Sequence, residues 1–496
     1  MSIDLSDNAD MSFKPNLSIV NKILDEDIVG EYESRLSLFT SWILSECRVI
    51  MSGPRSSGKT WISDHVKGFI GELKTEEGGE DGGRCYTLSA GSDKSAWYDM
   101  QNIVRADFII VLELNKIPKE AQEILKDWGE GKESKYKTVI TEGGYRKIKV
   151  FRLPPKPFIF CLADEEEARI GEQLLSRLIC IRTDATVTQN KAVLAQQAKL
   201  AKEMYNVKRV DKQLKENLKE HIRTMPPMDK YSFKHPASDL FMDSIPSFFT
   251  DSRRDFPKYL SNVAGICRFH WKERIIDEEQ KLIFITPQDM YLNHIVFANI
   301  LIESALKVSN IEREIIHTLK SIGSLSPKKE IQKELRKKGI NVSAHMIARH
   351  LNSLSDVGYL NKEQSTKGKE ILYEAGEFFD EFKFSVDWKK VIQSSLETMK
   401  THYPTHYEQY KKRFCDNPIV INPFTGKGVN LLELQSDDIQ PSKQKITSFL
   451  LSEKKSPDNS NAKPDTNLRA EVPEEVDVME VINEEQEMEV VEEDVV

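Results

Sequence analysis

The residues from Gly53 to Thr60 have the types and the spacing of a phosphate-binding loop. They read Gly-Pro-Arg-Ser-Ser-Gly-Lys-Thr, which matches the pattern G-x-x-x-x-G-K-[ST]. In this pattern backbone N–H groups surround the phosphates, the lysine reaches the β- and γ-phosphates, and the hydroxyl ligates Mg²⁺. The sequence therefore predicts binding of a nucleotide, taken as ATP with Mg²⁺ on Thr60, by Gly53, Pro54, Arg55, Ser56, Ser57, Gly58, Lys59 and Thr60.

A strand and a helix are expected on either side of this loop. Residues 48–51 are an apolar run of strand type, and residues 61–70 place apolar side chains at helical spacing. The alternative, a chance glycine-rich turn, is disfavoured because strand, loop and helix follow in the order that the motif needs.

A candidate general base ends the apolar segment 108–113. This segment reads as a buried parallel strand, expected beside the P-loop strand, and its last residue is Glu113. P-loop ATPases keep at that position the carboxylate that polarises the attacking water. The residue before it, where an Asp usually holds the Mg²⁺ shell, is Leu112, and Asp107 lies at the wrong end of the strand to replace it.

A basic hairpin is predicted around Gly143-Gly144. Residues 136–141 and 145–152 are strand-like runs on either side of this turn signal. One interpretation is a finger that contacts nucleic-acid phosphate, and the other is an exposed hairpin that its lysines keep soluble. The basic residues are Lys135, Lys137, Arg146, Lys147, Lys149 and Arg152.

The elements that position these groups indicate an α/β core followed by helices. Four strands that alternate with helices predict a doubly wound parallel sheet of the P-loop type. After it, the spacing predicts a helical lid with helices at 187–205, 210–222, 257–273 and 286–308.

Residues 310–375 read as a separate winged helix-turn-helix. Three short helices precede two strands that bracket a basic turn. In this interpretation His345 and Arg349 of the third helix enter a DNA groove, and Lys367 and Lys369 lie on the wing. The alternative is a protein-contact module.

Composition separates the folded part from an acidic tail. The net charge is −9, but residues 470–496 hold twelve acidic and no basic residues, so the rest carries about +3. We expect the tail to be disordered; it serves solubility or docks a partner such as a replication protein. Six scattered cysteines indicate reduced thiols, and no apolar run reaches membrane length, which favours the cytoplasm (a nucleoid location in a prokaryote) or the nucleus.

Several motifs, taken in order, resemble those of the minichromosome maintenance (MCM) family of AAA+ replicative helicases. Tyr86-Thr87 with Gly91-Ser92 is similar to the family's Y-T-x-x-x-G-S strand, and residues 113–117 are similar to its Walker B end. The basic hairpin occupies the position of the family's pre-sensor-1 hairpin. Ser176-Arg177-Leu178 is similar to its S-R-F motif, and residues 260–272, with His270, are similar to its lid helix. The resemblance covers residues 35–375.

This resemblance implies a hexameric ring that binds ATP between subunits and moves single-stranded DNA through its channel, while the winged helix binds duplex DNA. Arg177 would act in trans on the neighbouring subunit's ATP, Asp164 would stand at sensor 1, and Arg254 would be the sensor-2 arginine. Leu112 departs from the family, and so do the roughly thirty residues before the core, which leave no room for its N-terminal DNA-binding ring. The implied organisation is a flexible arm (1–30), an AAA+ core (31–185), a lid (186–309), a winged helix (310–375), a segment without prediction (376–445) and a disordered acidic tail (446–496).

Two other function classes fit the same sequence. One is an ATP-binding origin initiator or switch that marks DNA without processive unwinding, which Leu112 favours because weaker Mg²⁺ ligation slows turnover. The other is a remodelling ATPase that uses the winged helix for protein contacts.

Overall fold

The computed structural model describes residues 13–75, 78–88, 100–111, 119–142, 145–163, 172–184, 186–202, 210–242, 252–306, 310–338, 340, 342–356, 358–364, 370–376 and 386–434. The acidic tail lies outside these residues. Among the described helices, none is long and apolar enough to cross a membrane.

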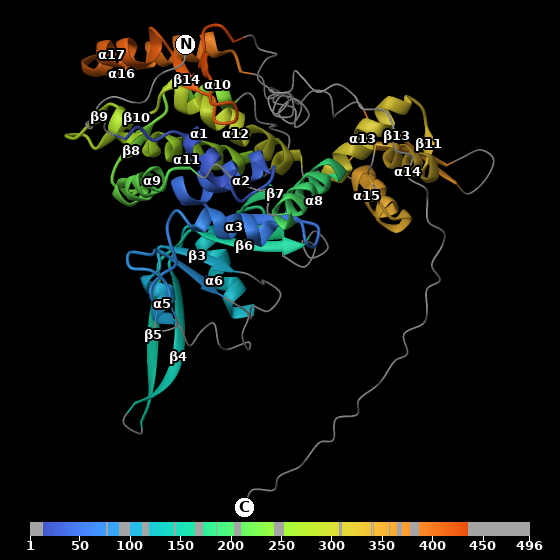
Figure 1. Ribbon diagram of the computed structural model, residues 1–496, viewed down its shortest axis with the longest axis horizontal. Helices are drawn as coiled ribbons and strands as arrows, with labels where there is room; N and C mark the ends of the chain where they lie inside the picture. The colour runs from blue at the N-terminus through green and yellow to red at the C-terminus, as the bar shows by residue number, and fades with distance from the viewer. Residues whose placement is uncertain are drawn as a thin grey trace, which may run out of the picture. The chain divides into compact units, whose positions relative to one another are not determined.

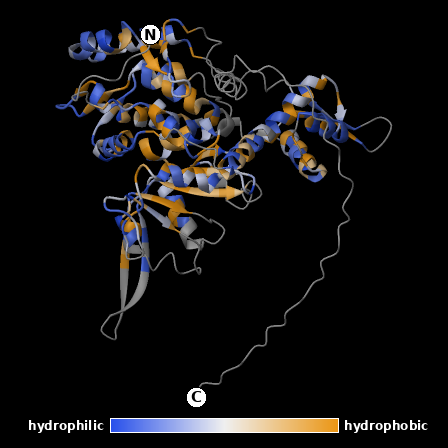
Figure 2. Cartoon of the chain, in the orientation of Figure 1, coloured by the Kyte–Doolittle hydropathy of each residue, from blue (hydrophilic) through white to orange (hydrophobic). Residues whose placement is uncertain are grey.

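A parallel sheet of five strands forms the centre of the α/β part (Figure 1). Its strand order is β2-β3-β6-β1-β7, and every neighbouring pair is parallel. The strands are apolar on both faces, as expected of a sheet covered by helices, and Figure 2 shows this apolar character. The α/β class is confirmed, with one strand more than the four predicted. The strands are β1 Val49–Gly53, β2 Cys85–Leu88, β3 Phe108–Val111, β6 Phe158–Ala163 and β7 Ile179–Arg182.

Short helices connect these strands. Aromatic packing joins α6 to the sheet, because the rings of Trp128 and Phe158 lie 6.4 Å apart and both side chains are buried. Helix α6 is thereby held against the sheet. The helices are α3 Lys59–Lys67, α5 Met100–Arg105, α6 Lys119–Gly129 and α7 Glu172–Leu175.

The predicted hairpin is present as β4 Ser134–Glu142 and β5 Tyr145–Leu153, which Figure 1 shows as a long two-stranded ribbon. The strands pair antiparallel from Ser134 opposite Leu153 to Glu142 opposite Tyr145. Its base is fixed to α6, since Trp128 Nε1 donates to the Leu153 carbonyl (3.2 Å) and Ser134 Oγ donates to Asp127 (2.7 Å).

The N-terminal segment is ordered from residue 13, so the flexible arm expected over 1–30 is wrong for residues 13–30. Helix α1, Leu17–Leu24, buries its apolar face, and α2, Tyr32–Leu38, continues into a π-helical turn, Phe39–Leu44. Arg35 is fully buried and donates to Asn21 Oδ1 (2.9 Å) and to the Ile28 carbonyl (2.7 Å). This guanidinium joins α2 to α1 and to the turn that follows α1.

The helices predicted between 187 and 308 are all present. Helix α11 begins at Ser252, five residues before Pro257, so the proline lies inside the helix, where it cannot donate a backbone hydrogen bond. The elements are α8 Val187–Ala201, α9 Lys212–Thr224, β8 Ser232–Lys234, α10 Ser238–Met242, α11 Ser252–Phe269, a 3₁₀ turn Trp271–Glu273, β9 Ile276–Asp277, β10 Leu282–Phe284 and α12 Pro287–Leu306.

Residues 310–376 form three helices and a three-stranded antiparallel sheet with the order β11-β13-β12. Ile316, Ile331 and Leu351, one from each helix, are fully buried in a core of this unit's own residues. The predicted helices and hairpin are therefore present. They are α13 Asn310–Ile322, β11 Ser326–Pro327, α14 Lys328–Lys337, α15 Ala344–Asp356, β12 Leu360–Gln364 and β13 Ile371–Ala375.

The segment 386–434, for which no prediction was possible from the sequence, returns to the region around α12. Tyr410 donates to the Ile285 carbonyl (2.8 Å), and the Trp388 ring packs edge-on against Tyr291 (5.3 Å) and His294 (5.8 Å). The 310–376 unit is thus inserted between two parts of one packed body. The segment contains α16 Trp388–His402, α17 Pro404–Tyr410, a π-helical turn Lys411–Cys415, β14 Ile419–Ile421 and β15 Gly428–Asn430.

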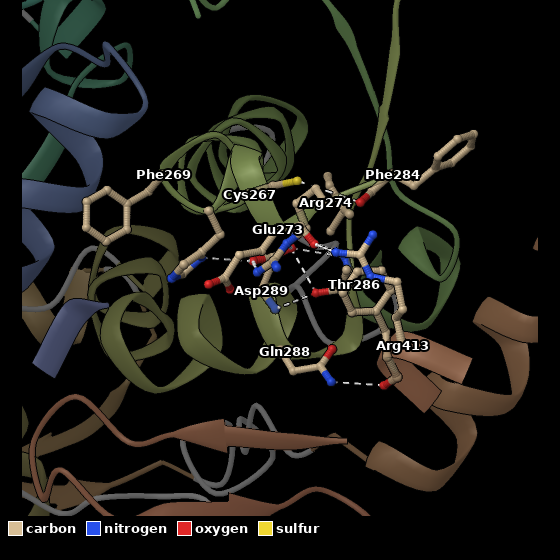
Figure 3. A network of polar contacts seen from close by, with 12 residues as sticks. Cys267, Phe269, Glu273, Arg274, Phe284, Thr286, Gln288, Asp289 and Arg413 are labelled. Atoms are coloured by element: carbon tan, nitrogen blue, oxygen red, sulfur yellow. Dashed lines mark hydrogen bonds and ion pairs between the residues drawn. The ribbon is translucent and has the colours of Figure 1, made fainter. Parts of the chain in front are cut away.

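A buried ionic cluster centres on Asp289 at the start of α12 (Figure 3). Its carboxylate accepts two hydrogen bonds from Arg274 (2.8 and 2.6 Å), one from the Thr286 hydroxyl (2.9 Å) and one from the Thr286 backbone N–H (3.1 Å), and His270 lies 3.3 Å away. Burial alone would raise the pKa of Asp289, but the Arg274 guanidinium and His270 hold that pKa well below its usual value. The same carboxylate holds the pKa of Arg274 above its usual value against the effect of burial.

Candidate nucleotide-binding site

The P-loop connects the end of β1 to the start of α3, as the sequence predicted. Gly58 caps the helix in the left-handed conformation (φ +85°), which a residue with a Cβ rarely adopts. Gly53 is required for another reason, since a Cβ there would lie 2.0 Å from Thr183 Oγ1. Both glycines of the motif are therefore explained by local geometry.

The loop has the donors that phosphate needs. Lys59 Nζ donates to two carbonyls of the loop itself, those of Gly53 (2.9 Å) and Pro54 (2.6 Å). Within the described residues, the backbone N–H groups of Gly58 and Thr60 donate to no acceptor, as expected at a helix N-terminus. Thr60 is exposed and opens the first turn of α3. Free N–H groups, a movable ammonium group and an exposed hydroxyl fit a nucleotide's phosphates with Mg²⁺.

Thr183, which sequence reasoning missed, supports the loop from the neighbouring strand. It follows β7 and is buried; its N–H donates to the Ser52 carbonyl (2.9 Å), and its hydroxyl lies 2.7 Å from Ser57 Oγ. Thr183 lies far from the loop in sequence, and no local motif marks it. Only the pairing of β7 with β1 brings the two together.

The expected position of Glu113 requires a correction. The strand before it, β3, is not adjacent to the P-loop strand, because β6 lies between β3 and β1. Two interstrand spacings, roughly 10 Å, therefore separate β3 from β1. That gap leaves room for a terminal phosphate and a water molecule at the carboxyl edge of the sheet. Glu113 itself, Leu112 and Asp164 lie outside the described residues.

Arg177 lies in a turn between α7, which contains Leu174 and Leu175, and β7. Its guanidinium pairs with Glu130 at the end of α6. Ile179 at the start of β7 pairs with Val49 at the start of β1, so Arg177 lies at the edge of the sheet away from the P-loop. The four residue-to-residue steps of β1 from Val49 to Gly53 span roughly 13 Å.

Arg254 does not lie at its own subunit's P-loop either. From α11 it contacts Ser176 Oγ, and Lys258 on the same helix donates to the carbonyls of Ser176 and Leu178 (3.0 Å each). The structure therefore brings Arg254 and Arg177 together in one basic group. It separates this group from the P-loop of the same chain.

Cys161 lies on β6, behind the start of α3. Its Sγ is 3.5 Å from Ser63 Oγ. Burial raises the pKa of the Cys161 thiol, and hydrogen bonds from Ser63 and Thr60 oppose this shift. The thiol is thus protonated at neutral pH and acts as a small packing group beside the loop.

The candidate nucleic-acid contacts lie on two separate elements. Lys137 is exposed on β4, and Arg146, Lys147 and Lys149 occupy β5 positions paired with residues 141, 140 and 138. His345 and Arg349 are exposed on α15. Lys367 and Lys369 lie outside the described residues.

Comparisons with known proteins add little to this geometry. No family model matches the chain, and no curated protein matches it. Among solved structures, the chain is similar to one described as a "putative ATPase" from Cytophaga hutchinsonii. That similarity has 12% identity and a TM-score of 0.30, and it covers 59% of this chain and 93% of the other.

Proposed function

We propose that this chain is an ATPase that binds MgATP at residues 53–60. The observation that carries the proposal is the loop itself. A complete G-x-x-x-x-G-K-T motif joins a buried parallel strand to a helix, and its donors at the helix N-terminus are open. Lys59 would leave the loop carbonyls to neutralise the phosphates, and Thr60 would hold Mg²⁺. The metal, when bound, supplies charge stabilisation of the phosphoryl oxygens.

Hydrolysis requires a base and a group that stabilises the charge of the transition state. Glu113 would accept a proton from the attacking water as the water oxygen bonds to the γ-phosphorus and the bond from that phosphorus to the bridging oxygen breaks, which releases ADP and phosphate. Arg177 lies at the opposite edge of the sheet from its own P-loop, so we assign it to the ATP of a neighbouring copy. A site shared head-to-tail between copies closes into a ring when the rotation between copies divides a full turn, and we propose a hexamer of the MCM-like AAA+ type.

We further propose that ATP hydrolysis moves DNA. The basic hairpin β4–β5 is anchored to α6 through Trp128 and Ser134, so a shift of α6 would move it. In a ring, such hairpins would draw single-stranded DNA through the centre by its phosphates. The 310–376 unit, with a winged-helix order of elements, would hold duplex DNA.

A second candidate, an ATP-binding initiator or switch, is favoured by one residue. Leu112 stands where an aspartate would complete the Mg²⁺ shell, and the absence of that aspartate slows turnover. Such a protein would bind DNA through the 310–376 unit and change state with the nucleotide, without processive movement.

Binding can be measured on one side chain next to the loop. Trp61 is 54% exposed, and its Nε1 is fixed to the Asp27 carbonyl (2.9 Å), whereas Trp42, Trp128 and Trp388 are buried. We expect MgATP to change the tryptophan fluorescence, and Lys59→Ala to remove the change by weakening binding at least a hundredfold. An unchanged titration in Lys59→Ala would contradict the P-loop assignment.

Hydrolysis with and without single-stranded DNA then separates the two candidates. Strong stimulation by DNA, lost in Glu113→Gln, supports the motor. Tight MgATP binding with negligible hydrolysis under both conditions supports the switch.

A further inference from the structure

Helix α14 carries most of the positive charge among the helices of the 310–376 unit. Residues 328–338 hold six basic and two acidic side chains, a net charge of +4. Helix α15, which the helix-turn-helix interpretation inserts into the groove, holds Arg349 and Asp356 and has no net charge apart from its histidines.

The charge of α14 is arranged along one exposed face. Lys329, Lys333 and Arg336 stand at positions i, i+4 and i+7, which share a helix face, and all three are exposed. Ile331 and Leu335 face the core and are fully buried. We call Lys329, Lys333 and Arg336 the basic stripe; it spans roughly 10 Å along the helix axis.

No carboxylate of the described residues pairs with the basic stripe. Of the two carboxylates on this helix, Glu330 and Glu334, the second pairs with Lys337 (2.6 Å) and not with the stripe, and Lys338 is held by Thr318 (3.0 Å). Three unpaired cations on one side of a short helix repel one another. They have no role in the core, so their position favours an external polyanion.

Some polar side chains of α15 already pair with other residues of the same unit. His350 Nδ1 lies 3.0 Å from Glu312 of α13, and Asp356 pairs with Lys362 of β12 (3.7 Å). The exposed side chains that remain include His345, Arg349 and Asn352. These can hydrogen-bond base edges, but they add little net charge.

We propose that α14, and not α15, is the phosphate-contacting helix through which this unit holds duplex DNA. The inference rests on the proposed DNA role of the unit. In helix-turn-helix proteins the first helix crosses the backbone, and phosphate contacts give affinity without sequence information. Duplex DNA presents one negative charge per roughly 1.7 Å of its axis, so a 10 Å stripe meets several phosphates. Binding is therefore tolerant of sequence and sensitive to salt.

The test compares two triple variants of the full chain on one labelled duplex across a range of salt concentrations. The first is Lys329→Gln, Lys333→Gln and Arg336→Gln, which removes the stripe. The matched control is His345→Ala, Arg349→Gln and Asn352→Ala on α15. Each phosphate contact contributes about 0.9 to the slope of log affinity against log salt, so the first variant should lose about 2.7 units of slope. Its affinity should fall at least tenfold, and the control should lose about one unit or less.

Three outcomes would overturn the inference: an unchanged slope in the stripe variant, a larger loss in the α15 variant, or tight binding of the wild type to an acidic peptide but not to duplex DNA. Thermal unfolding of both variants checks that the unit remains folded. ATP hydrolysis without DNA is measured in parallel. A wild type that does not hydrolyse ATP would count against the ATPase proposal. A wild type that hydrolyses ATP but does not bind duplex DNA would overturn only the DNA assignment.

Discussion

The P-loop and the Asp289 cluster place charged groups in opposite settings. At the P-loop, Lys59 is half-exposed and donates to the carbonyls of Gly53 and Pro54 in its own loop, beside open backbone N–H groups. At the cluster, Asp289 and Arg274 are buried, and the carboxylate oxygens are saturated with hydrogen bonds. The first site has donors open to an external anion, and the donors of the second are already paired with the Asp289 carboxylate.

This difference predicts different consequences of mutation. Removing a charge from an open site should reduce binding or turnover and leave the fold intact, because water replaces the lost contacts. Removing a charge from a closed cluster leaves a buried partner without compensation, which destabilises the fold. The predictions that follow test this division, beginning with the largest expected effect.

Arg177→Ala should lower the rate of ATP hydrolysis about a thousandfold or more, because an arginine that acts in trans stabilises transition-state charge. Binding of MgATP, measured by Trp61 fluorescence, should stay within about twofold. Mixing this variant with Glu113→Gln should restore part of the activity, since one interface in the mixture has both groups intact. Full activity in Arg177→Ala alone would contradict the shared site.

Asp289→Asn should lower the free energy of unfolding by about 3–5 kcal/mol, because Arg274 would stay buried without its counter-charge. Denaturant unfolding measures the loss. Lys59→Ala is the matched control and should cost less than about 0.5 kcal/mol. Similar losses in the two variants would remove the distinction between the open site and the closed cluster.

His294 should make stability depend on pH. Burial against Trp388 lowers its pKa to about 3, so the unfolded chain binds a proton below about pH 6.5 and the folded chain does not. Stability is therefore lost as the pH falls, by about 2 kcal/mol between pH 7 and 5 from this group. Comparing unfolding at the two pH values in the wild type and in His294→Leu measures this share. His235, whose pKa burial lowers to about 4, should retain its own dependence in the variant.

Thr183→Val should have the smallest effect. It keeps the shape of the side chain but removes its hydroxyl contact with Ser57, at a cost of about 1 kcal/mol. We expect roughly fivefold weaker MgATP binding with little change in unfolding. A loss of stability without a loss of affinity would assign Thr183 to the fold and not to the loop.

The sequence predicted what depends on neighbours along the chain. The P-loop is a contiguous motif, and the helices and the hairpin follow from periodicity and a glycine turn. What it missed depends on pairing over long separations: the insertion of β6 between β3 and β1, the support of Ser57 by Thr183, and the packing of Trp388 on α12. No local pattern encodes such contacts, because they follow from strand order and chain return.

The insertion of residues 310–376 has a mechanical consequence. The chain leaves the packed body after Leu306 and re-enters it at Val386, so the unit is attached by two connections. Both ends of the unit are therefore joined in sequence to the same packed body, through α12 on one side and α16 on the other. A load on the unit would reach α12 and α16 together. Two chain connections, and not one, therefore link the unit to the packed body.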